Sequence, residues 1–359
     1  MLKGNKGEWG EIYAFCYLLN SGTLQAADKD LRPIEDVFFP IIKIIREDMS
    51  FVPADDKGGK VRVYKKDALI GEYTRRQFEE ILKILYKEIP NGERAFEIPA
   101  THPFFSSLHI DKLKADSFHK QDIDIQIHDI NTGIKPICGF SIKSFLGSNP
   151  TLVNAGANTN FIYKISGCDD AIMKEFNGIN TRNKLIDRMM YLKSKHCRIS
   201  FTDMMTSGQF RVNMKFIDTL MPQIIGECLL DFYSGGTGTK SVKDVVSDVS
   251  QKDTCKLENP EMYKYKMKLF LCACALGMTP EKDWVGGEDA NGGYITVKRD
   301  GSVVCYHIYN RSDFYEYLYN YTYFEKGSSS RHKYMTIFES NGEYYMCLNL
   351  QIRFKQITS

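Results

Sequence analysis

The sequence lacks the features that would place a protein in a membrane or outside the cell. Among its 359 residues no apolar run reaches the length of a membrane-spanning helix, because Lys or Gly interrupts the longest candidates. The first residues, MLKGNKGEWGE, contain no apolar signal core. We therefore expect a cytoplasmic protein that has no membrane partner.

The motifs of two common site classes are also missing. There is no CxxC pair among the ten cysteines, and Cys272 and Cys274 would point to different sides of a helix, so a zinc site has little support. The segment SGGTGTK at 234–240 lacks the GK[ST] ending of a phosphate-binding loop and favours a flexible connection. The cysteines that lie in apolar runs, and that we expect to be buried free thiols in a reducing compartment, are Cys16, Cys138, Cys228, Cys272 and Cys274.

A strong charge of either sign is absent as well. The formal net charge of +2 neither requires nor excludes nucleic acid, since a binding face can be basic while the rest compensates. Eight Lys and Arg residues do fall within residues 182–215. They form either a solvated helix face or a surface that contacts phosphates. With 43% hydrophobic and 26% charged residues, the composition is that of a globular protein, and the length suggests two or three domains.

Periodicity predicts an α/β protein with a mixed central β-sheet flanked by helices, a helical middle and a β-rich C-terminal part. We expect helices over 6–20, 33–48, 75–87 and 260–276, and mainly helical structure over 169–230. We expect strands in hairpins over 61–73 and 121–144, and further strands over 161–165, 293–298, 302–309, 334–339 and 344–354. The predicted domains are a catalytic core at 1–168, a helical region at 169–283 and a recognition region at 284–359.

The hairpin over 121–144 carries the most informative pattern. Asp122 and Asp124 alternate with isoleucines in the first strand, and Ser141 and Lys143 share a face of the second. Mg²⁺-dependent nucleases use a carboxylate and a lysine on neighbouring strands to hold a metal and polarise a water. The alternative is a solvent-facing hairpin with an ordinary ion pair.

One carboxylate is a thin ligand set for Mg²⁺, so a second must come from elsewhere. The position two before Lys143 is Ser141 rather than an acidic residue. In the first predicted helix, Glu8 and Glu11 lie three residues apart on one face. They either complete a metal site or simply favour the positive N-terminal end of the helix. Should neither glutamate serve, Asp122 or Asp129 could supply the second carboxylate.

Four blocks of the sequence resemble the HpaII-type restriction endonucleases, a variant of the PD-(D/E)xK nucleases. They are KGNKGEWGEIY, DIDIQIHDINTGI, GFSIKSFLGSNPTLVNAGANTNFIY and LNLQIRF, and they extend over most of the chain. The resemblance implies that Asp124 and Glu8 bind Mg²⁺ and that Lys143 is the motif lysine. It places Ser141 where related enzymes have a carboxylate. Glu8 ranks above Glu11 because only Glu8 completes the motif Gly-x-x-Gly-Glu.

The resemblance also implies a substrate and a product. The substrate would be double-stranded DNA with a short palindrome, CCGG in HpaII-type enzymes, cut to leave 5′-phosphate and 3′-hydroxyl ends. A homodimer is a candidate for the assembly that cuts it. Each candidate DNA-contacting residue could instead belong to an ordinary turn or exposed strand. These candidates are Asn154, Asn158, Asn160, Ser330, Arg331, His332, Gln351 and Arg353. The aromatic run over 314–324 favours core packing over base stacking.

Two other functions fit parts of the sequence. A DNA-binding protein derived from a nuclease could have lost its second carboxylate, with Ser141 as the trace of that loss. A protein-interaction module could use the aromatic C-terminal sheet. Cleavage of DNA would indicate the endonuclease, binding of DNA without cleavage would indicate the DNA-binding protein, and no binding of DNA would indicate the interaction module.

Overall fold

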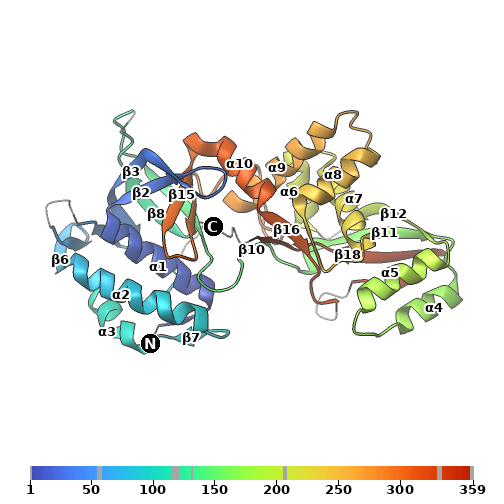
Figure 1. Cartoon of the computed structure of the whole chain (residues 1–359), viewed down its shortest axis with the longest axis horizontal. Helices are drawn as coiled ribbons and strands as arrows, with labels where there is room; N and C mark the ends of the chain where they lie inside the picture. Colours follow the sequence, from blue (N-terminus) through green and yellow to red (C-terminus); the bar gives the residue numbers. More distant parts are fainter. Residues whose placement is uncertain are drawn as a thin grey trace.

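The computed structural model of the protein describes residues 2–54, 59–114, 121–130, 132–204, 208–329 and 334–355. Within this part the chain is a mixed α/β protein with two lobes (Figure 1). Each lobe has its own core of buried apolar side chains. Among the described residues, no helix is both long and apolar enough to cross a membrane.

The first lobe is centred on a sheet of six strands that closes into a barrel. The strand order is β2-β15-β14-β9-β8-β3, and β3 pairs again with β2. Two pairs, β9 with β14 and β2 with β15, are parallel and the others antiparallel. The expected mixed sheet is therefore present, but it is closed. Its strands are β2 (Thr23–Ala27), β3 (Pro33–Arg46), β8 (Ile123–Ile127), β9 (Ile137–Ser144), β14 (Gly293–Val297) and β15 (Val303–His307).

Strand β3 closes the barrel because it is long enough to serve two neighbours. Its first half pairs with β2 and its second half with β8, and Pro40 lies near the change of partner. The predicted helix over 33–48 is therefore wrong. A proline is costly inside a helix, whereas a strand tolerates it where one ladder gives way to another. The β-branched run that follows Pro40 also suits a strand.

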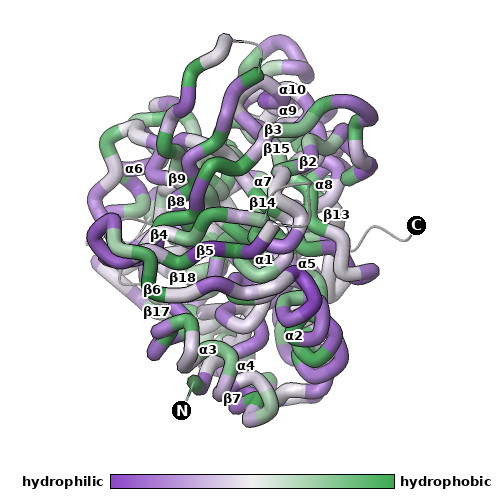
Figure 2. The backbone as a smooth tube through the Cα atoms, turned by 90° about the vertical axis from the view of Figure 1, so that its left-hand side faces the viewer, coloured by the Kyte–Doolittle hydropathy of each residue, from purple (hydrophilic) through white to green (hydrophobic). Residues whose placement is uncertain are grey.

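Helix α1 (Lys6–Ser21) packs between the barrel strands and α2 (Arg75–Glu88), as Figure 1 shows. Both helices were predicted, and Figure 2 shows α2 alternating between hydrophilic and hydrophobic residues. The contact of α1 with β9 is very close, because a Cβ on Gly10 would lie 2.3 Å from Cβ of Ser144. Glycine at this position thus sets how near the acidic residues of α1 come to the sheet.

Short elements complete this lobe. The hairpin predicted over 61–73 is confirmed, and β4 joins it to β3. Near the N-terminus, β1 pairs with β7. The elements are β1 (Lys3–Gly4), β4 (Met49–Val52), β5 (Val61–Lys65), β6 (Ala68–Tyr73), β7 (Phe96–Glu97) and α3 (His102–Ser107).

The second lobe combines two four-stranded sheets with most of the remaining helices. Their orders are β12-β11-β18-β17 and β10-β19-β16-β13. The strands are β10 (Thr151–Val153), β11 (Asn160–Ser166), β12 (Arg198–Met204), β13 (Thr239–Ser241), β16 (Thr322–Glu325), β17 (Ile337–Ser340), β18 (Glu343–Asn349) and β19 (Ile352–Phe354). The helices are α4 (Asp170–Gly178), α5 (Lys184–Ser194), α6 (Gln209–Ile217), α7 (Met221–Ser234), α8 (Val242–Lys252) and α9 (Pro260–Leu276), followed by α10 (Arg311–Asn320).

These assignments confirm helix 260–276 and the strand expected near 161–165. The C-terminal part is rich in strands as expected, but the run over 344–354 is divided into β18 and β19, which belong to different sheets. Strand β12 interrupts the region expected to be helical, and α10 was not predicted. The aromatic side chains of α10 are mostly core residues, as expected, with Phe314 and Tyr317 buried. The predicted domain boundaries stay predictions, although β14 and β15 pair with strands of the N-terminal barrel. All ten cysteines are free, and most are buried.

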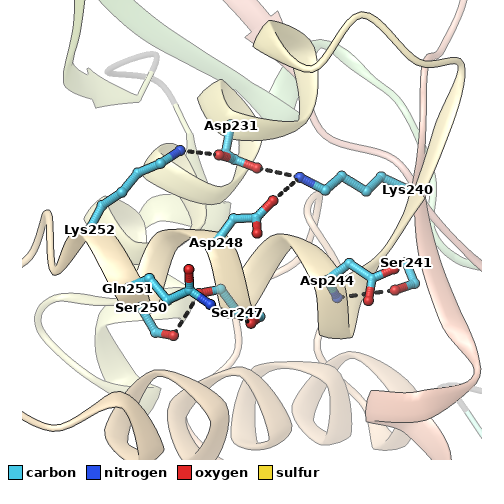
Figure 3. Close-up of polar contacts among 9 residues, drawn as sticks. All are labelled: Asp231, Lys240, Ser241, Asp244, Ser247, Asp248, Ser250, Gln251 and Lys252. Carbon is cyan, nitrogen blue, oxygen red and sulfur yellow. Dashed lines mark hydrogen bonds and ion pairs between the residues drawn. The ribbon is translucent and has the colours of Figure 1, made fainter.

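A network of four charged residues ties α7, β13 and α8 together (Figure 3). The side chain of Asp231 is only 9% exposed and accepts a hydrogen bond from Lys240 Nζ at 2.7 Å. Lys252 bonds to its other oxygen, and Lys240 also reaches Asp248. Burial would raise the pKa of Asp231, but the bonds from both lysines outweigh it and hold the pKa below its usual value. The network is thus electrically satisfied.

Candidate active site

The candidate site lies where β8 begins and β9 ends, and the hairpin register decides which residues meet there. Asp124 pairs with Gly139, and Ile123 with Phe140, so Asp122 lies opposite Ser141. Lys143 is four residues beyond Gly139, about 13 Å along the strand. Asp124 and Lys143 therefore do not lie at the same depth of the hairpin, as a site made of these two residues would require. Asp122 is the nearer carboxylate by two residues.

Asp122 is held against β9 by two bonds to one carboxylate oxygen. Its Oδ2 accepts the backbone N–H of Ile142 at 2.7 Å and the hydroxyl of Ser141 at 3.3 Å. Ser141 is buried. The serine that replaces an expected acidic residue therefore orients the carboxylate of Asp122. Asp124 has a different local partner, since its Oδ1 accepts from Gln121 Nε2 at 3.0 Å.

The two glutamates of α1 have different roles in the helix. Glu8 Oε2 accepts the backbone N–H of Asn5 at 2.8 Å, while the Asn5 side chain accepts from Glu8 N, which is a capping box. Glu8 therefore stabilises the helix end, the alternative that the sequence left open. Glu11 lies about one turn further on and takes no part in this box. Its carboxyl group lies near the end of the hairpin, because Asp122 and Lys143 are among its electrostatic neighbours.

The electrostatics of Glu11 identify its neighbours. Burial is the main cause that raises the pKa of Glu11 to about 8, and repulsion from Asp122 adds to it. Lys143 acts in the opposite direction, as does Lys114, while Glu8 contributes a smaller repulsion. Asp124 is not among these strongest influences. The structure thus brings together Glu11, Asp122 and Lys143, one from α1 and two from the hairpin.

These charges are not neutralised within the described part of the chain. No ion pair or hydrogen bond of the side chains of Glu11 or Lys143 occurs there. Nor does any group of three His, Cys, Asp or Glu side chains in the described ranges form a ready metal centre. Two carboxylates beside a lysine, at a sheet end next to a helix N-terminus, can bind a divalent cation together with a phosphate.

Comparisons with known proteins identify the family of the chain. The family described as HpaII restriction endonuclease matches residues 5–354. A curated relative, the Type II restriction enzyme HpaII of Haemophilus parainfluenzae, is 37% identical over 360 residues, which cover 98% of each chain. The chain belongs to the HpaII restriction endonuclease family. It is therefore a Type II restriction endonuclease, and the two non-enzymatic alternatives are set aside. No solved structure matches the chain.

The asparagines that this HpaII-family member carries after β9 differ in exposure. Asn154 is exposed, Asn158 is half-buried, and Asn160 is buried. Asn349 is fully buried and donates to Asn160 Oδ1 at 2.6 Å and to Gly156 O at 2.7 Å. Asn160 therefore belongs to an internal network, and Asn154 is the most accessible of the three to DNA.

The candidate recognition residues of the C-terminal strand are already paired. Gln351 Nε2 and Arg353 Nη1 both donate to Glu325 Oε2 at 3.2 Å. Arg353 also bonds to the carbonyl of Asn149. The other candidates, Ser330, Arg331 and His332, lie outside the described residues. The basic stretch at 182–215 is partly engaged too, as Arg188 donates to three backbone carbonyls.

The sequence did not rank the two aspartates of the hairpin, because their depth relative to Lys143 depends on the strand register, in which Asp122 lies opposite Ser141. The fallback Asp129 lies at the other end of the hairpin, where it is buried and accepts bonds from Thr132 and Tyr309. For the two glutamates the sequence did contain a signal, because Asn5 followed three residues later by Glu8 is the pattern of a capping box.

Proposed function

We propose that this restriction endonuclease cleaves double-stranded DNA with Mg²⁺ and leaves 5′-phosphate and 3′-hydroxyl ends. The proposed site consists of Glu11, Asp122 and Lys143, in place of the set headed by Asp124 and Glu8. The observation that carries the proposal is the pairing of two carboxylates that repel each other beside a lysine without an ion-pair partner among the described residues. Such an arrangement destabilises the free protein and gains from a bound cation.

The residues present fit Mg²⁺. This ion prefers oxygen ligands, keeps several waters, and is commonly held by one or two carboxylates together with substrate phosphates. Glu11 and Asp122 supply two carboxylates, and the bonds from Ile142 and Ser141 both go to Oδ2 of Asp122. Burial and the nearby carboxylate of Asp122 raise the pKa of Glu11 more than Lys143 and Lys114 lower it, so a bound cation would stabilise the charged form of Glu11. When bound, the ion would activate water and neutralise charge on the phosphate.

The chain's own residues have separable tasks in this reaction. Ser141 and the Ile142 amide fix the orientation of Asp122, so its carboxylate does not have to reorganise. The ammonium group of Lys143 would stabilise the negative charge that develops at the scissile phosphate and orient the attacking water. Gly10 lets α1 approach β9 closely enough for Glu11 to face Asp122. Water would attack the phosphorus in line with the 3′ oxygen. A P–O bond to the water oxygen forms, the P–O3′ bond breaks, the water gives up a proton to solvent, and the leaving 3′ oxygen takes up a proton from solvent to become the 3′-hydroxyl.

For the recognition site we propose a CCGG-like palindrome, as the resemblance to HpaII-type enzymes implies. A palindrome presents the same bases to two copies of a protein related by a two-fold axis. Because the proposed site cuts one strand, we also propose that a homodimer cuts both. Sedimentation of the protein with and without a duplex carrying the site would test the dimer, and a monomer on fully cut DNA would contradict it.

Digestion of a sequenced plasmid tests the function directly. With Mg²⁺ we expect discrete fragments, and sequencing of their ends should place every cut within one short palindrome. Ligation without prior phosphatase or kinase treatment would confirm 5′-phosphate and 3′-hydroxyl ends. The same digest in EDTA should leave the plasmid intact. Equal cutting in EDTA would remove the metal from the proposal, and scattered ends would remove the palindrome.

A further inference from the structure

The segment that leads to residue 114 crosses the N-terminal end of α1. Ile110 and Leu113 are buried, whereas Asp111, Lys112 and Lys114 are exposed. Leu113 fills the space beside Gly4, since a Cβ on that glycine would lie 2.5 Å from Leu113 Cδ1. The same Cβ would lie 2.7 Å from Glu8 Oε2. The segment is therefore packed next to the acidic end of α1.

A half-buried arginine fixes the backbone of this segment. Arg46, the last residue of β3, donates from Nη2 to the carbonyl of Leu113 at 2.8 Å and also to the carbonyl of Lys112. A guanidinium group that bonds to two successive carbonyls holds them in one orientation. The backbone position of Lys114 is thus fixed from β3, one of the strands of the barrel. Lys114 is consequently not on an unanchored loop.

Lys114 lies near the proposed catalytic carboxylates, but its side chain does not bond to the described part of the fold. It is one of the two cations that act most strongly on Glu11, together with Lys143. Lys143 comes from β9, and Lys114 from the separate segment that Arg46 anchors. The side chain of Lys114 is exposed and makes no ion pair or hydrogen bond within the described part of the chain. A cation kept near a site yet unpaired is available to a ligand of opposite charge.

We propose that Lys114 is a second phosphate-binding lysine of the active site, which contacts the DNA backbone at or next to the scissile phosphate, and that Arg46 is its positioning residue. This inference rests on the proposed function. Because Lys143 and Lys114 belong to different elements, the backbone at the cut would be held from two directions. Phosphate contacts of this kind fix the register of the DNA and add affinity without reading sequence.

The test compares Lys114→Ala with Lys112→Ala, the exposed lysine two residues earlier. Binding of a synthetic duplex that carries the mapped site is titrated in EDTA at several salt concentrations, and cleavage is measured with Mg²⁺. For Lys114→Ala we expect the slope of log affinity against log salt to fall by about one. We expect cleavage to fall by roughly tenfold or more. Lys112→Ala should match the wild type, and Lys114→Arg should keep most of both properties.

Arg46→Lys tests the anchor. It should reduce the salt slope in the same direction as Lys114→Ala, and combining the two changes should add little, because both remove one contact. Thermal unfolding of each variant shows whether the fold is intact, and Lys114→Ala should unfold with the wild type because its side chain is exposed. Additive losses from the two changes would remove Arg46 from the proposal.

Lys143→Ala separates this inference from the proposed function. If Lys143→Ala loses cleavage while Lys114→Ala keeps the wild-type rate and salt slope, Lys114 is an ordinary surface lysine and this inference is overturned alone. If Lys143→Ala cuts like the wild type, the active site itself is misplaced and both proposals fall. Loss in both variants, with Lys112→Ala unchanged, supports them together.

Discussion

Two charge clusters in this molecule are built on opposite principles. In the second lobe, Asp231 is surrounded by Lys240 and Lys252, and its pKa lies below the usual value although it is buried. In the first lobe, Glu11 faces Asp122, and burial with this repulsion raises its pKa to about 8. The cluster around Asp231 stabilises the fold. The cluster around Glu11 lowers the stability of the fold, and only a bound cation would reverse this effect.

The contrast has a physical basis. Taking a carboxylate out of water is costly unless hydrogen bonds and opposite charges compensate. At Asp231 the fold supplies both from three elements (Figure 3). At Glu11 the fold supplies lysines that do not bond to it, so the compensation is incomplete. Incomplete compensation at a conformationally fixed position is typical of a functional site.

The largest effect is expected at the hairpin carboxylates. Asp122→Asn should lower the cleavage rate by on the order of a thousandfold or more, because the amide cannot serve as an anionic metal ligand. Asp124→Asn is the matched change two residues away and should cost far less, since Asp124 lies opposite Gly139. Single-turnover cleavage of a duplex with the mapped site measures both. The reverse order would restore Asp124 as the metal ligand.

In the cluster around Asp231, a substitution should affect the stability of the fold and leave the rate of DNA cleavage unaltered. Asp231→Asn should lower the free energy of unfolding by about 2 kcal/mol near pH 7, because two lysines lose their counter-charge. The folded-state pKa of Asp231 is depressed, so its contribution is present above the unfolded pKa and is lost as the pH falls through the folded value.

Chemical denaturation of Asp231→Asn and wild type at pH 7 and in acid measures this dependence. The difference between them should shrink toward zero in acid, provided that the wild type remains folded there. Cleavage by folded Asp231→Asn should equal that of the wild type. A stability difference that is the same at both pH values would mean that packing, rather than charge, makes the contribution.

Glu11→Gln should change the stability of the fold in the direction opposite to Asp231→Asn. The folded-state pKa of Glu11 is raised to about 8, so its stabilising protonated form is complete below the unfolded pKa and is lost as the pH rises through 8. In EDTA at pH 9, Glu11→Gln should therefore be more stable than the wild type, by roughly 1 kcal/mol or about 2 °C in melting temperature after allowance for solvent screening.

Thermal unfolding at pH 5 and pH 9, with and without Mg²⁺, measures the Glu11 effect. The difference in stability between Glu11→Gln and the wild type should be smaller at pH 5 than at pH 9. At pH 9, Mg²⁺ should also reduce this difference, because it stabilises only the wild type. Glu8→Gln is the control, and it should destabilise instead, because it weakens the capping box. Cleavage should be lost in Glu11→Gln and retained in Glu8→Gln. A destabilised Glu11→Gln would place Glu11 with the satisfied charges.

The smallest effect is expected for a substitution of Arg353. This substitution tests whether an arginine that is already paired within the fold also recognises a DNA base. Arg353 donates to Glu325 and to the carbonyl of Asn149, so by the comparison above it is structural. Arg353→Ala should lower stability by about 1 kcal/mol and leave the ratio of cognate to random DNA affinity unchanged. A selective loss of roughly 1–3 kcal/mol in cognate binding would instead show that Arg353 reads a guanine.

Much of the fold followed from the sequence. Helices 6–20, 75–87 and 260–276 and the hairpins over 61–73 and 121–144 have strong periodicity, and the structure confirms them. The failures occurred where partners distant in sequence decide the outcome. Pro33–Arg46 is a strand because it has β2 on one side and β8 on the other, and no local pattern announces two such neighbours. For the same reason, the closure of the barrel could not be foreseen.

The candidate site divides in the same way. The sequence by itself determined that acidic residues, a serine and a lysine lie on one hairpin, and that two glutamates lie on the first helix, because alternation and helical spacing are local properties. The spacing of Asn5 and Glu8, which is that of a capping box, is local as well. Only the tertiary structure decided that Asp122 rather than Asp124 lies nearer Lys143, and that Glu11 and Lys114 lie close to them. Register, helix rotation and the anchoring of a distant segment depend on packing between elements, which no local pattern encodes.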